Sequence, residues 1–417
     1  MKTLLKSATI IDPASKHHGK KRDVLIDKGI IKKIAASIND DGAKSVHLKN
    51  LHISQGWFDP STSFGEPGYE ERENLDDGLK TAAMSGFTTV AVNSNTQPVT
   101  QSKSHVKFLK SKAYGHAVSL LPIGALTIES AGEDLAELYD MHSEGCISFY
   151  DHKKPITNAN MLKIALQYAQ NFNGLVQSFP FDASVAKNGV VNEEKNSTRL
   201  GLKGIPALSE ELQITRDLYL LEYTGGRLHI PTISTEKSVR LIKEAKKKGL
   251  AVSCSVSINN LCLTDDVLES FDTYYKLLPP LRTKKDVQAL RKGLKDGTID
   301  GVTSDHDPID VEHKRTEFDH ASFGSIGLES CFGALLKVTE LETAIKGLTG
   351  LKEPFGVPKN PVLEGETANL TLFSPDAEWI FTEESILSTS KNSALLGHEM
   401  QGNVFGIFNN GQLVLNA

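Results

Sequence analysis

The chain has 417 residues, of which 39% are hydrophobic and 24% charged, and this balance excludes an intrinsically disordered protein. The net charge of -6 gives no general attraction for nucleic acid, and the most apolar stretch, residues 117–128, is too short to cross a bilayer. Four cysteines form no C-x-x-C pair, so neither a zinc knuckle nor a disulfide framework is expected, and a cytoplasmic location is predicted.

Short β-type runs occupy both ends of the chain. Near the start, VLID and IIKKI flank the turn Asp27-Lys28-Gly29. The last fifty residues contain NLTLF, VFGIF and QLVL, with Asn410-Gly411 as a hairpin turn. These patterns predict one small β-sandwich domain composed of residues 1–53 and 366–417.

Between these ends, in residues 54–365, short apolar runs alternate with amphipathic helical stretches. The runs are HISQGWF, FTTVAV, VSLLPIG, CISFY, GLVQS, RLHIP, LAVSCSV and IDGVTS. One helical stretch ends in three lysines followed by Gly249, a typical C-terminal cap, and another has an apolar face of Met161, Leu162, Ala165, Leu166 and Ala169. About eight β/α units favour an α/β fold of the (β/α)8 TIM barrel type. A doubly wound sheet is the alternative, but no G-x-G-x-x-G follows a strand.

Several longer segments carry a family resemblance. They read GEPGYEERENLDDGLKTAAMSGFTTVAVNSNTQPV, NEEKNSTRLGLKGIPALSEE, FDTYYKLLPPLR, and LKDGTIDGVTSDHDPID followed by EFDHASFGSIGLES. From Gly56 to about Gly327 the chain resembles dihydroorotase of the bacterial type, among the cyclic amidohydrolases. The resemblance is specific for the fold and less so for the activity, which depends on the site.

The resemblance implies a zinc site at the barrel mouth with four histidine ligands, none of which is present. The corresponding positions are Ser61, Ser63, Phe179 and Thr232. Hydroxyl groups and a benzene ring are poor zinc ligands, so we expect no zinc and no other cofactor. Asp305 matches the family's proton-moving aspartate, and Asp151 stands where an acidic residue near the metals is expected.

The substrate contacts that the family implies are also altered. Gly65 replaces the arginine that holds the substrate carboxylate, Leu278 replaces an asparagine, and Ile309 replaces a histidine. Only Asn95 matches a substrate-contacting asparagine, and it is the predicted substrate-binding residue. Asn95 could equally hold a loop through an Asx turn.

Asp305 and His306 are the predicted catalytic candidates. A cluster of these two residues with Asp151 and His152 would be the remaining route to acid–base or metal chemistry. The competing interpretation is structural, because an aspartate at a strand end often caps the next turn and a histidine beside carboxylates is often only hydrogen-bonded. His229 is expected to be a buried structural histidine.

Three functional hypotheses follow. The first is a catalytically silent dihydroorotase homologue of pyrimidine biosynthesis, kept as a structural or regulatory partner. The resemblance implies a homo-oligomer and, as a possible partner, aspartate transcarbamoylase. The second is an active cyclic amidohydrolase with an atypical metal site, and the third is a small-molecule-binding module that uses a vacant barrel mouth. Restoring the four histidines together with an arginine at position 65 is predicted to recover zinc binding before activity.

Overall fold

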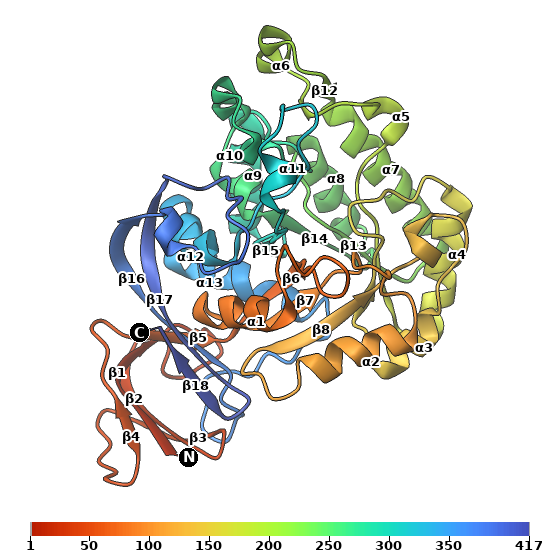
Figure 1. Cartoon of the computed structure of the whole chain (residues 1–417). Helices are drawn as coiled ribbons and strands as arrows, with labels where there is room; N and C mark the ends of the chain where they lie inside the picture. Colours follow the sequence, from red (N-terminus) through yellow and green to blue (C-terminus); the bar gives the residue numbers. More distant parts are fainter. Residues whose placement is uncertain (1, 417) are drawn as a thin grey trace.

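The computed structural model describes residues 2–416, and its larger part is a barrel of eight parallel strands surrounded by helices (Figure 1). The strands follow one another in chain order around the sheet: β6 (Trp57–Thr62), β7 (Phe87–Val92), β8 (Ser119–Gly124), β9 (Ser148–Phe149), β10 (Leu175–Gln177), β13 (Arg227–Ile230), β14 (Val252–Ser257) and β15 (Gly301–Thr303). A parallel bridge between Thr62 and His306 joins the last strand region to the first. The predicted (β/α)8 barrel is therefore confirmed.

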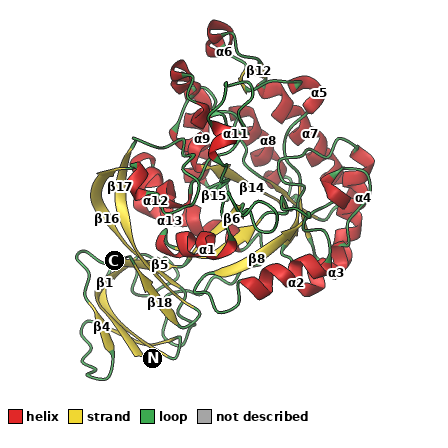
Figure 2. Cartoon of the chain, in the orientation of Figure 1, coloured by secondary structure: helices red, strands yellow, loops and turns green. Residues whose placement is uncertain are grey.

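The helices that cover the barrel lie mainly between successive strands (Figure 2). They are α1 (Leu75–Met84), α2 (Lys103–Lys112), α3 (Leu138–Glu144), α4 (Ala159–Ala169), α5 (Ala183–Ala186), α6 (Lys195–Leu200), α7 (Ala207–Thr224), α8 (Glu236–Lys247), α9 (Ile258–Cys262), α10 (Lys284–Asp296), α11 (Val311–Lys314), α12 (Leu328–Val338) and α13 (Leu341–Thr349). Two short strands, β11 (Val191–Asn192) and β12 (Gly204–Ile205), pair beside α6. No helix in residues 2–416 is long and apolar enough to cross a membrane.

Local sequence signals account for several of these boundaries. The five apolar residues predicted for one helical face are all buried on α4. Helix α8 ends in a basic turn, and Gly249 follows with a φ of +82°, a conformation in which glycine carries no Cβ penalty. Thr283 and Asp286 form a reciprocal capping box at the start of α10.

Strands from both ends of the chain join in one hydrogen-bonded sheet. These strands are β1 (Lys2–Ile10), β2 (Lys21–Asp27), β3 (Ile30–Ala35), β4 (Lys44–Val46), β5 (His52–Gln55), β16 (Leu370–Ile380), β17 (Glu399–Asn409) and β18 (Gln412–Leu415). Asn410 and Gly411 form the predicted two-residue turn, both with positive φ. Apolar residues of β1, β2, β3, β5, β16 and β17 share one core.

The run HISQGWF is divided between the two parts of the molecule, although the sequence predicts it as the first barrel strand. His52–Gln55 forms β5 of the terminal sheet, and the barrel begins only at Trp57 in β6. Gly56 separates the two strands, and a Cβ there would come within 2.2 Å of the Thr88 hydroxyl. Every residue of β6 is buried, so the strand has no alternation of buried and exposed residues from which its start could be predicted.

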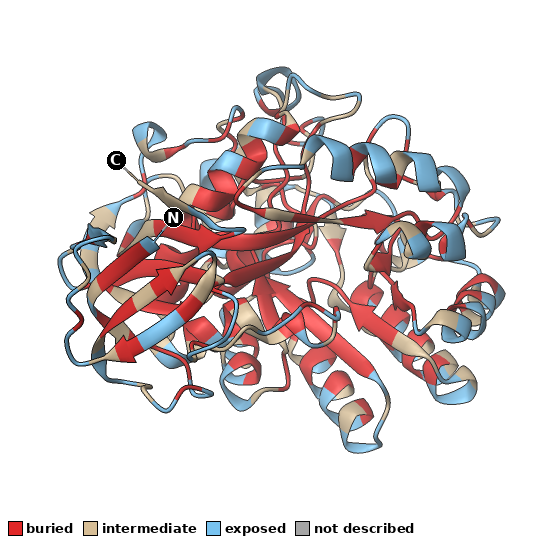
Figure 3. Ribbon diagram, turned by 90° about the horizontal axis from the view of Figure 1, so that it is seen from below, coloured by how far each residue is buried: buried red, intermediate tan, exposed pale blue. Residues whose placement is uncertain are grey.

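The buried core fills the barrel interior and the space under the helices, while the outer helix faces are exposed (Figure 3). Trp57 at the start of β6 packs against Phe332 and Phe373, with ring centroids 4.6 and 5.6 Å away. These contacts tie the first barrel strand to α12 and to β16 of the terminal sheet. The carboxyl ends of the barrel strands remain the place where chemistry is expected in this fold.

Candidate functional site

Two serines occupy the end of β6, where the resemblance implies the first two zinc ligands. The amide of Asn93 donates to the hydroxyl oxygens of Ser61 and Ser63, at 3.1 and 3.2 Å. The Ser63 hydroxyl in turn donates to Oδ1 of Asn95 at 3.1 Å. Both serines are buried. Their oxygen atoms are therefore committed to a neutral network with the residues that follow β7.

Phe179 and Thr232 replace the other two expected ligands. Phe179 is 1% exposed and stacks on Phe181 with a centroid distance of 5.9 Å, within an apolar cluster that includes Tyr150. Thr232 has a φ of 48°, and its side-chain oxygen is buried without a hydrogen-bond partner. Phe179 is therefore packed among apolar neighbours, and the binding module that would use a vacant barrel mouth stays a prediction.

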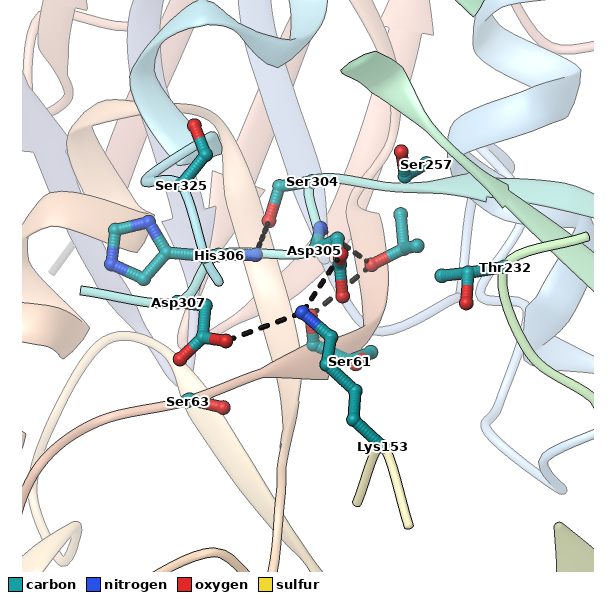
Figure 4. Close-up of polar contacts among 12 residues, drawn as sticks. Ser61, Ser63, Lys153, Thr232, Ser257, Ser304, Asp305, His306, Asp307 and Ser325 are labelled. Carbon is teal, nitrogen blue, oxygen red and sulfur yellow. Dashed lines mark hydrogen bonds and ion pairs between the residues drawn. The ribbon is translucent and has the colours of Figure 1, made fainter. Parts of the chain in front are cut away.

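Lys153, which follows β9, is a cation that pairs with two aspartates that follow β15. Its ammonium nitrogen lies 3.1 Å from Oδ2 of Asp305 and 3.2 Å from Oδ2 of Asp307 (Figure 4). Only 12% of the Lys153 side chain is exposed. Burial alone lowers the pKa of a lysine, but the two carboxylates outweigh burial and raise the pKa of Lys153. The lysine is therefore held in its charged form.

The two carboxylates respond differently to this arrangement. Burial raises the pKa of Asp305 to about 6 despite the adjacent ammonium. Burial also raises the pKa of Asp307, but Lys153 outweighs that effect and lowers the pKa below the ordinary value. Lys153, Asp305 and Asp307 thus form a buried triad. Its lysine is positively charged, and Asp307 ionises more readily than Asp305.

Asp59, which lies two residues before Ser61 on β6, links the first and last strands of the barrel. Its carboxylate accepts hydrogen bonds from the Thr303 hydroxyl at 2.6 Å and from the backbone N–H groups of Ser304 and Ser61 at 3.0 and 3.1 Å. The residue is fully buried, and burial raises its pKa. Asp59 thus joins β6 to the end of β15 and positions the backbone on which Asp305 stands.

Asp151 does not face Asp305, contrary to the expectation of an acidic residue near the metals. Its Oδ1 accepts the backbone N–H groups of Leu126 and Thr127 at 2.8 and 3.0 Å, and its Oδ2 accepts the Thr127 hydroxyl. Both oxygens are engaged by the loop after β8. The carboxylate therefore orders that loop and is not available to a group at the centre of the mouth.

His306 also has a structural environment. Its ring points away from Lys153 (Figure 4), and Nε2 lies 2.8 Å from Oε2 of Glu73, with both side chains fully buried. Nδ1 accepts the N–H groups of Gly327 and Leu328 at 3.2 and 3.4 Å. Glu73 outweighs burial and raises the pKa of His306. These contacts agree with the structural interpretation of His306, and its catalytic role stays a prediction.

The expected cluster of Asp151, His152, Asp305 and His306 does not assemble. His152 packs edge-on against Tyr150 at 5.6 Å, and burial followed by the charge of Lys153 lowers the pKa of His152 to about 3. Within residues 2–416, no group of three or more His, Cys, Asp or Glu side chains is placed to hold a metal ion. His229 is buried between the Ser253 and Ser255 hydroxyls, as expected of a structural histidine.

The side chains present do not fit the zinc ion that the resemblance implies. Zinc takes nitrogen, sulfur or carboxylate donors, usually three or four from the protein. Four expected donors are replaced by three hydroxyl groups and a benzene ring, and the remaining aspartate is paired with an ammonium group. A divalent cation beside Asp305 would meet the positive charge of Lys153.

The substrate side of the mouth is equally altered. A Cβ atom on Gly65 would lie 1.9 Å from the carbonyl oxygen of Tyr69, so no side chain fits there without movement of the backbone. Ile309 is buried, and Leu278 joins the apolar cluster around Phe179. Asn95, the predicted substrate-binding residue, accepts a hydrogen bond from Ser63. Its role toward a substrate stays a prediction.

Three residues of this site were not predicted. They are Lys153, Glu73 and Asn93. Lys153 and Asp305 are far apart in sequence, and no local pattern joins them. For Asn93, the NSNTQP segment offered a signal, because both its asparagines follow a buried strand and reach the serines after β6.

Known proteins resemble this chain over its whole length. A family model described as dihydro-orotase-like matches residues 53–238. A dihydroorotase from Pelotomaculum thermopropionicum is 37% identical over 100% of this chain and 99% of its own length. A dihydroorotase from Geobacter metallireducens is 35% identical, with 96% of each chain covered.

Solved structures give the same architecture at lower identity. An L-hydantoinase (dihydropyrimidinase) from Arthrobacter aurescens superimposes with a TM-score of 0.88 at 20% identity, over 99% of this chain and 96% of that protein. A dihydropyrimidinase from Brevibacillus agri gives a TM-score of 0.85 at 22% identity, over 100% and 95%. These structural matches establish the fold alone, namely a barrel with a smaller sheet built from both chain ends.

Proposed function

This chain belongs to the dihydroorotase family, and from that premise we propose that it has lost zinc-dependent catalysis and serves pyrimidine biosynthesis as a structural or regulatory partner. One observation carries the proposal: the ammonium of Lys153 is bound between Asp305 and Asp307 at the barrel mouth. The chain keeps the barrel fold of the family. Ion pairs among its own side chains stand where the family's reaction centre would lie.

The Lys153 network competes directly with a metal ion. A zinc ion bound by a carboxylate lies about 2.0–2.2 Å from the oxygen. In this chain Oδ2 of Asp305 already contacts a charged nitrogen at 3.1 Å. To admit a divalent ion, Lys153 would have to leave two buried partners or lose its proton. Both changes are unfavourable because unpaired buried charges are costly.

Asp305, the remaining candidate for acid–base catalysis, cannot supply the rate enhancement that a zinc ion would. Zinc can lower the pKa of bound water from 15.7 to about 7, which corresponds to roughly 12 kcal/mol of differential stabilisation. A lone general base typically contributes about 10² to 10⁴ in rate. The carboxylate of Asp305 is moreover paired with Lys153, which keeps its pKa lower than burial alone would make it.

Loss of the substrate clamp supports the same conclusion. An arginine could bind a substrate carboxylate through two parallel hydrogen bonds, but the backbone at Gly65 leaves no room for any side chain. If another catalytic mechanism had only replaced zinc on the same substrate, the carboxylate-binding arginine would not need to be lost. The barrel mouth therefore fits a site that has lost its activity better than one that has acquired a different mechanism.

Aspartate transcarbamoylase is the partner we propose, because silent members of this family are known to accompany that enzyme. The test is co-expression of the full chain with the aspartate transcarbamoylase of the same organism, followed by size-exclusion chromatography. We expect co-elution at a mass above that of either protein alone. Separate elution at micromolar concentrations of both proteins would exclude this partner.

The loss of catalysis is tested by elemental analysis beside a dihydroorotate hydrolysis assay. The protein is produced in zinc-supplemented medium, and the dihydroorotase from Geobacter metallireducens is prepared in parallel as a positive control. We expect far less than one zinc per chain and no turnover above the buffer rate. Zinc near two per chain together with turnover would contradict the proposal. Turnover that survives exhaustive chelation would instead support an atypical amidohydrolase.

A further inference from the structure

Four basic side chains line one cavity among the outer helices. The cavity has a volume of about 470 Å³ and is bordered by residues of α10, of the end of α12 and of the start of α13. Its charged and polar lining includes Arg291, Lys292, Lys295, Lys337, Glu340 and Thr343. Four cations thus surround the cavity with a single carboxylate among them, although the whole chain has a net charge of -6. We call this place the α10 cavity.

Two of the four cations have no acidic partner. In residues 2–416, no carboxylate forms an ion pair with Arg291 or Lys292. Nε of Arg291 donates to the carbonyl oxygen of Leu261 at 2.9 Å, but the two terminal nitrogen atoms of the guanidinium donate to no atom of the described chain. The planar guanidinium group can bind two oxygen atoms of one anion through parallel hydrogen bonds. Arg291 is therefore free to act as an anion ligand.

The other two cations have partners that an anion could replace. Nζ of Lys295 lies 2.9 Å from Oε1 of Glu340, and Nζ of Lys337 lies 3.1 Å from Oε2 of Glu399. Both glutamate side chains are 75% exposed. Ion pairs of this kind contribute little to stability because water and salt screen them. Both lysines can therefore turn toward an anion that carries more charge than a carboxylate.

The spacing of the charges on α10 is unfavourable without such an anion. Arg291 and Lys295 are four residues apart, so they share one face of the helix, where like charges repel. The negative end of the helix dipole accounts for Lys295, which lies in the last turn. It does not account for Arg291 and Lys292, which precede that turn. An anion bound in the α10 cavity would relieve the repulsion among the three cations.

The start of α13 adds to the attraction for an anion. Glu340 is the N-cap residue of this helix, but its side chain makes no capping hydrogen bond and pairs with Lys295 instead. Thr343 of the first turn also lines the α10 cavity. The first N–H groups of α13 have no side-chain partner in residues 2–416, so the positive end of the helix dipole is not offset there. This end of the helix reinforces the field of the four basic side chains.

We propose that the α10 cavity binds a phosphate-bearing small molecule, with Arg291 and Lys292 as its main ligands. A phosphate monoester carries about -1.5 to -2 charges at pH 7, and its oxygen atoms match the guanidinium group. The cavity volume lies within the range of small-molecule sites, about 300–1,000 Å³. Nucleic acid is not favoured, because the chain is acidic overall and the cations surround one cavity. The proposal goes beyond the proposed function and does not depend on the loss of catalysis.

The test is isothermal titration calorimetry of the full chain in a buffer free of phosphate and sulfate. The probes are inorganic phosphate, adenosine 5′-monophosphate and adenosine. We expect saturable binding of both phosphate compounds at low salt, with Kd below about 1 mM, and no binding of adenosine. Tighter binding of the monophosphate would support a phosphate ester as the ligand, and equal affinity would support inorganic phosphate itself.

Paired substitutions separate this site from general electrostatic attraction. Arg291→Gln combined with Lys292→Gln should weaken phosphate binding at least about tenfold. The matched control is Lys284→Gln combined with Lys285→Gln, which removes the same charge from exposed residues at the other end of α10 and should keep the wild-type affinity. Circular dichroism checks that both double variants are folded.

Three results would overturn the proposal. The first is no saturable binding of inorganic phosphate or the monophosphate at about 10 mM. The second is equal weakening of phosphate binding by the two double variants, because the cations at the α10 cavity would then have no special role. The third is binding of double-stranded DNA without binding of either small phosphate compound, since the basic side chains would then form a surface for polyanions.

Discussion

Lys153 Nζ lies 3.1 Å from Asp305 Oδ2, and this contact places a fixed positive charge beside the one aspartate that the family's reaction centre retains. The same ammonium reaches Asp307 at 3.2 Å. A lysine side chain therefore supplies the cation that balances these buried carboxylates. Its charge is part of the folded chain and is not acquired from solution.

Removal of the Lys153 ammonium should destabilise the protein strongly. In Lys153→Met the apolar length is kept, but Asp305 and Asp307 lose their buried counter-charge. We expect the free energy of unfolding to fall by about 3–5 kcal/mol, measured by urea denaturation at neutral pH. The control is Lys154→Met, an exposed neighbour that should change stability by less than about 0.5 kcal/mol. Equal effects of the two substitutions would show that the triad contributes no stability.

The pH dependence of stability should report Asp305. Burial raises its folded pKa from 3.8 to about 6, so the folded state holds the proton more tightly than the unfolded chain. The stabilising effect of that proton is full below about pH 4 and is lost as the pH rises through about 6. The wild type should thus lose up to about 3 kcal/mol relative to Asp305→Asn between pH 4 and 7. Parallel stability curves for the two proteins would contradict the raised pKa.

His306 should act as a structural residue. His306→Ala leaves Glu73 buried without its partner and the N–H groups of Gly327 and Leu328 unsatisfied. We expect a loss of about 3 kcal/mol in thermal or urea unfolding. His320→Ala is the control, because that side chain is 74% exposed and should have little effect. Unchanged stability of His306→Ala would return this residue to the list of catalytic candidates.

Gly65 should resist replacement. Because a Cβ at this position would lie 1.9 Å from the Tyr69 carbonyl oxygen, Gly65→Ala should cost at least about 2 kcal/mol of folding stability. Gly42→Ala, where the nearest atom is the end of the Asp40 side chain at 3.3 Å, is the matched control. If both alanine variants are equally stable, the loop after β6 adapts readily and an arginine clamp could be rebuilt.

Zinc binding should return only when the lysine is removed. The sequence predicted that four histidines and an arginine at position 65 would recover zinc binding. The structure changes this prediction, because an arginine does not fit at position 65 and the charge of Lys153 would remain beside Asp305. We expect Ser61→His, Ser63→His, Phe179→His and Thr232→His together to bind zinc weakly. Addition of Lys153→Met should raise zinc content toward stoichiometry in elemental analysis. Stoichiometric zinc with Lys153 intact would show that the ammonium can move aside.

The barrel and the loss of its ligands could be read from the sequence, but the contacts at the mouth could not. The identity of residues 61, 63, 179 and 232 follows from alignment alone. The direction of Asp151, which turns to the loop after β8, depends on backbone N–H groups some 25 residues earlier. The partner of His306 is Glu73, more than two hundred residues away.

By itself the sequence determined the alternation of strands and helices and the absence of imidazole donors, because periodicity and side-chain chemistry are local properties. Only the tertiary structure decided that the ammonium of Lys153 lies beside Asp305. Lys153 and Asp305 both have positive φ, at 54° and 49°, a conformation that sequence rules do not assign to these residues. The fold brings the ammonium and the carboxylate within 3.1 Å of each other, and burial away from water strengthens their attraction.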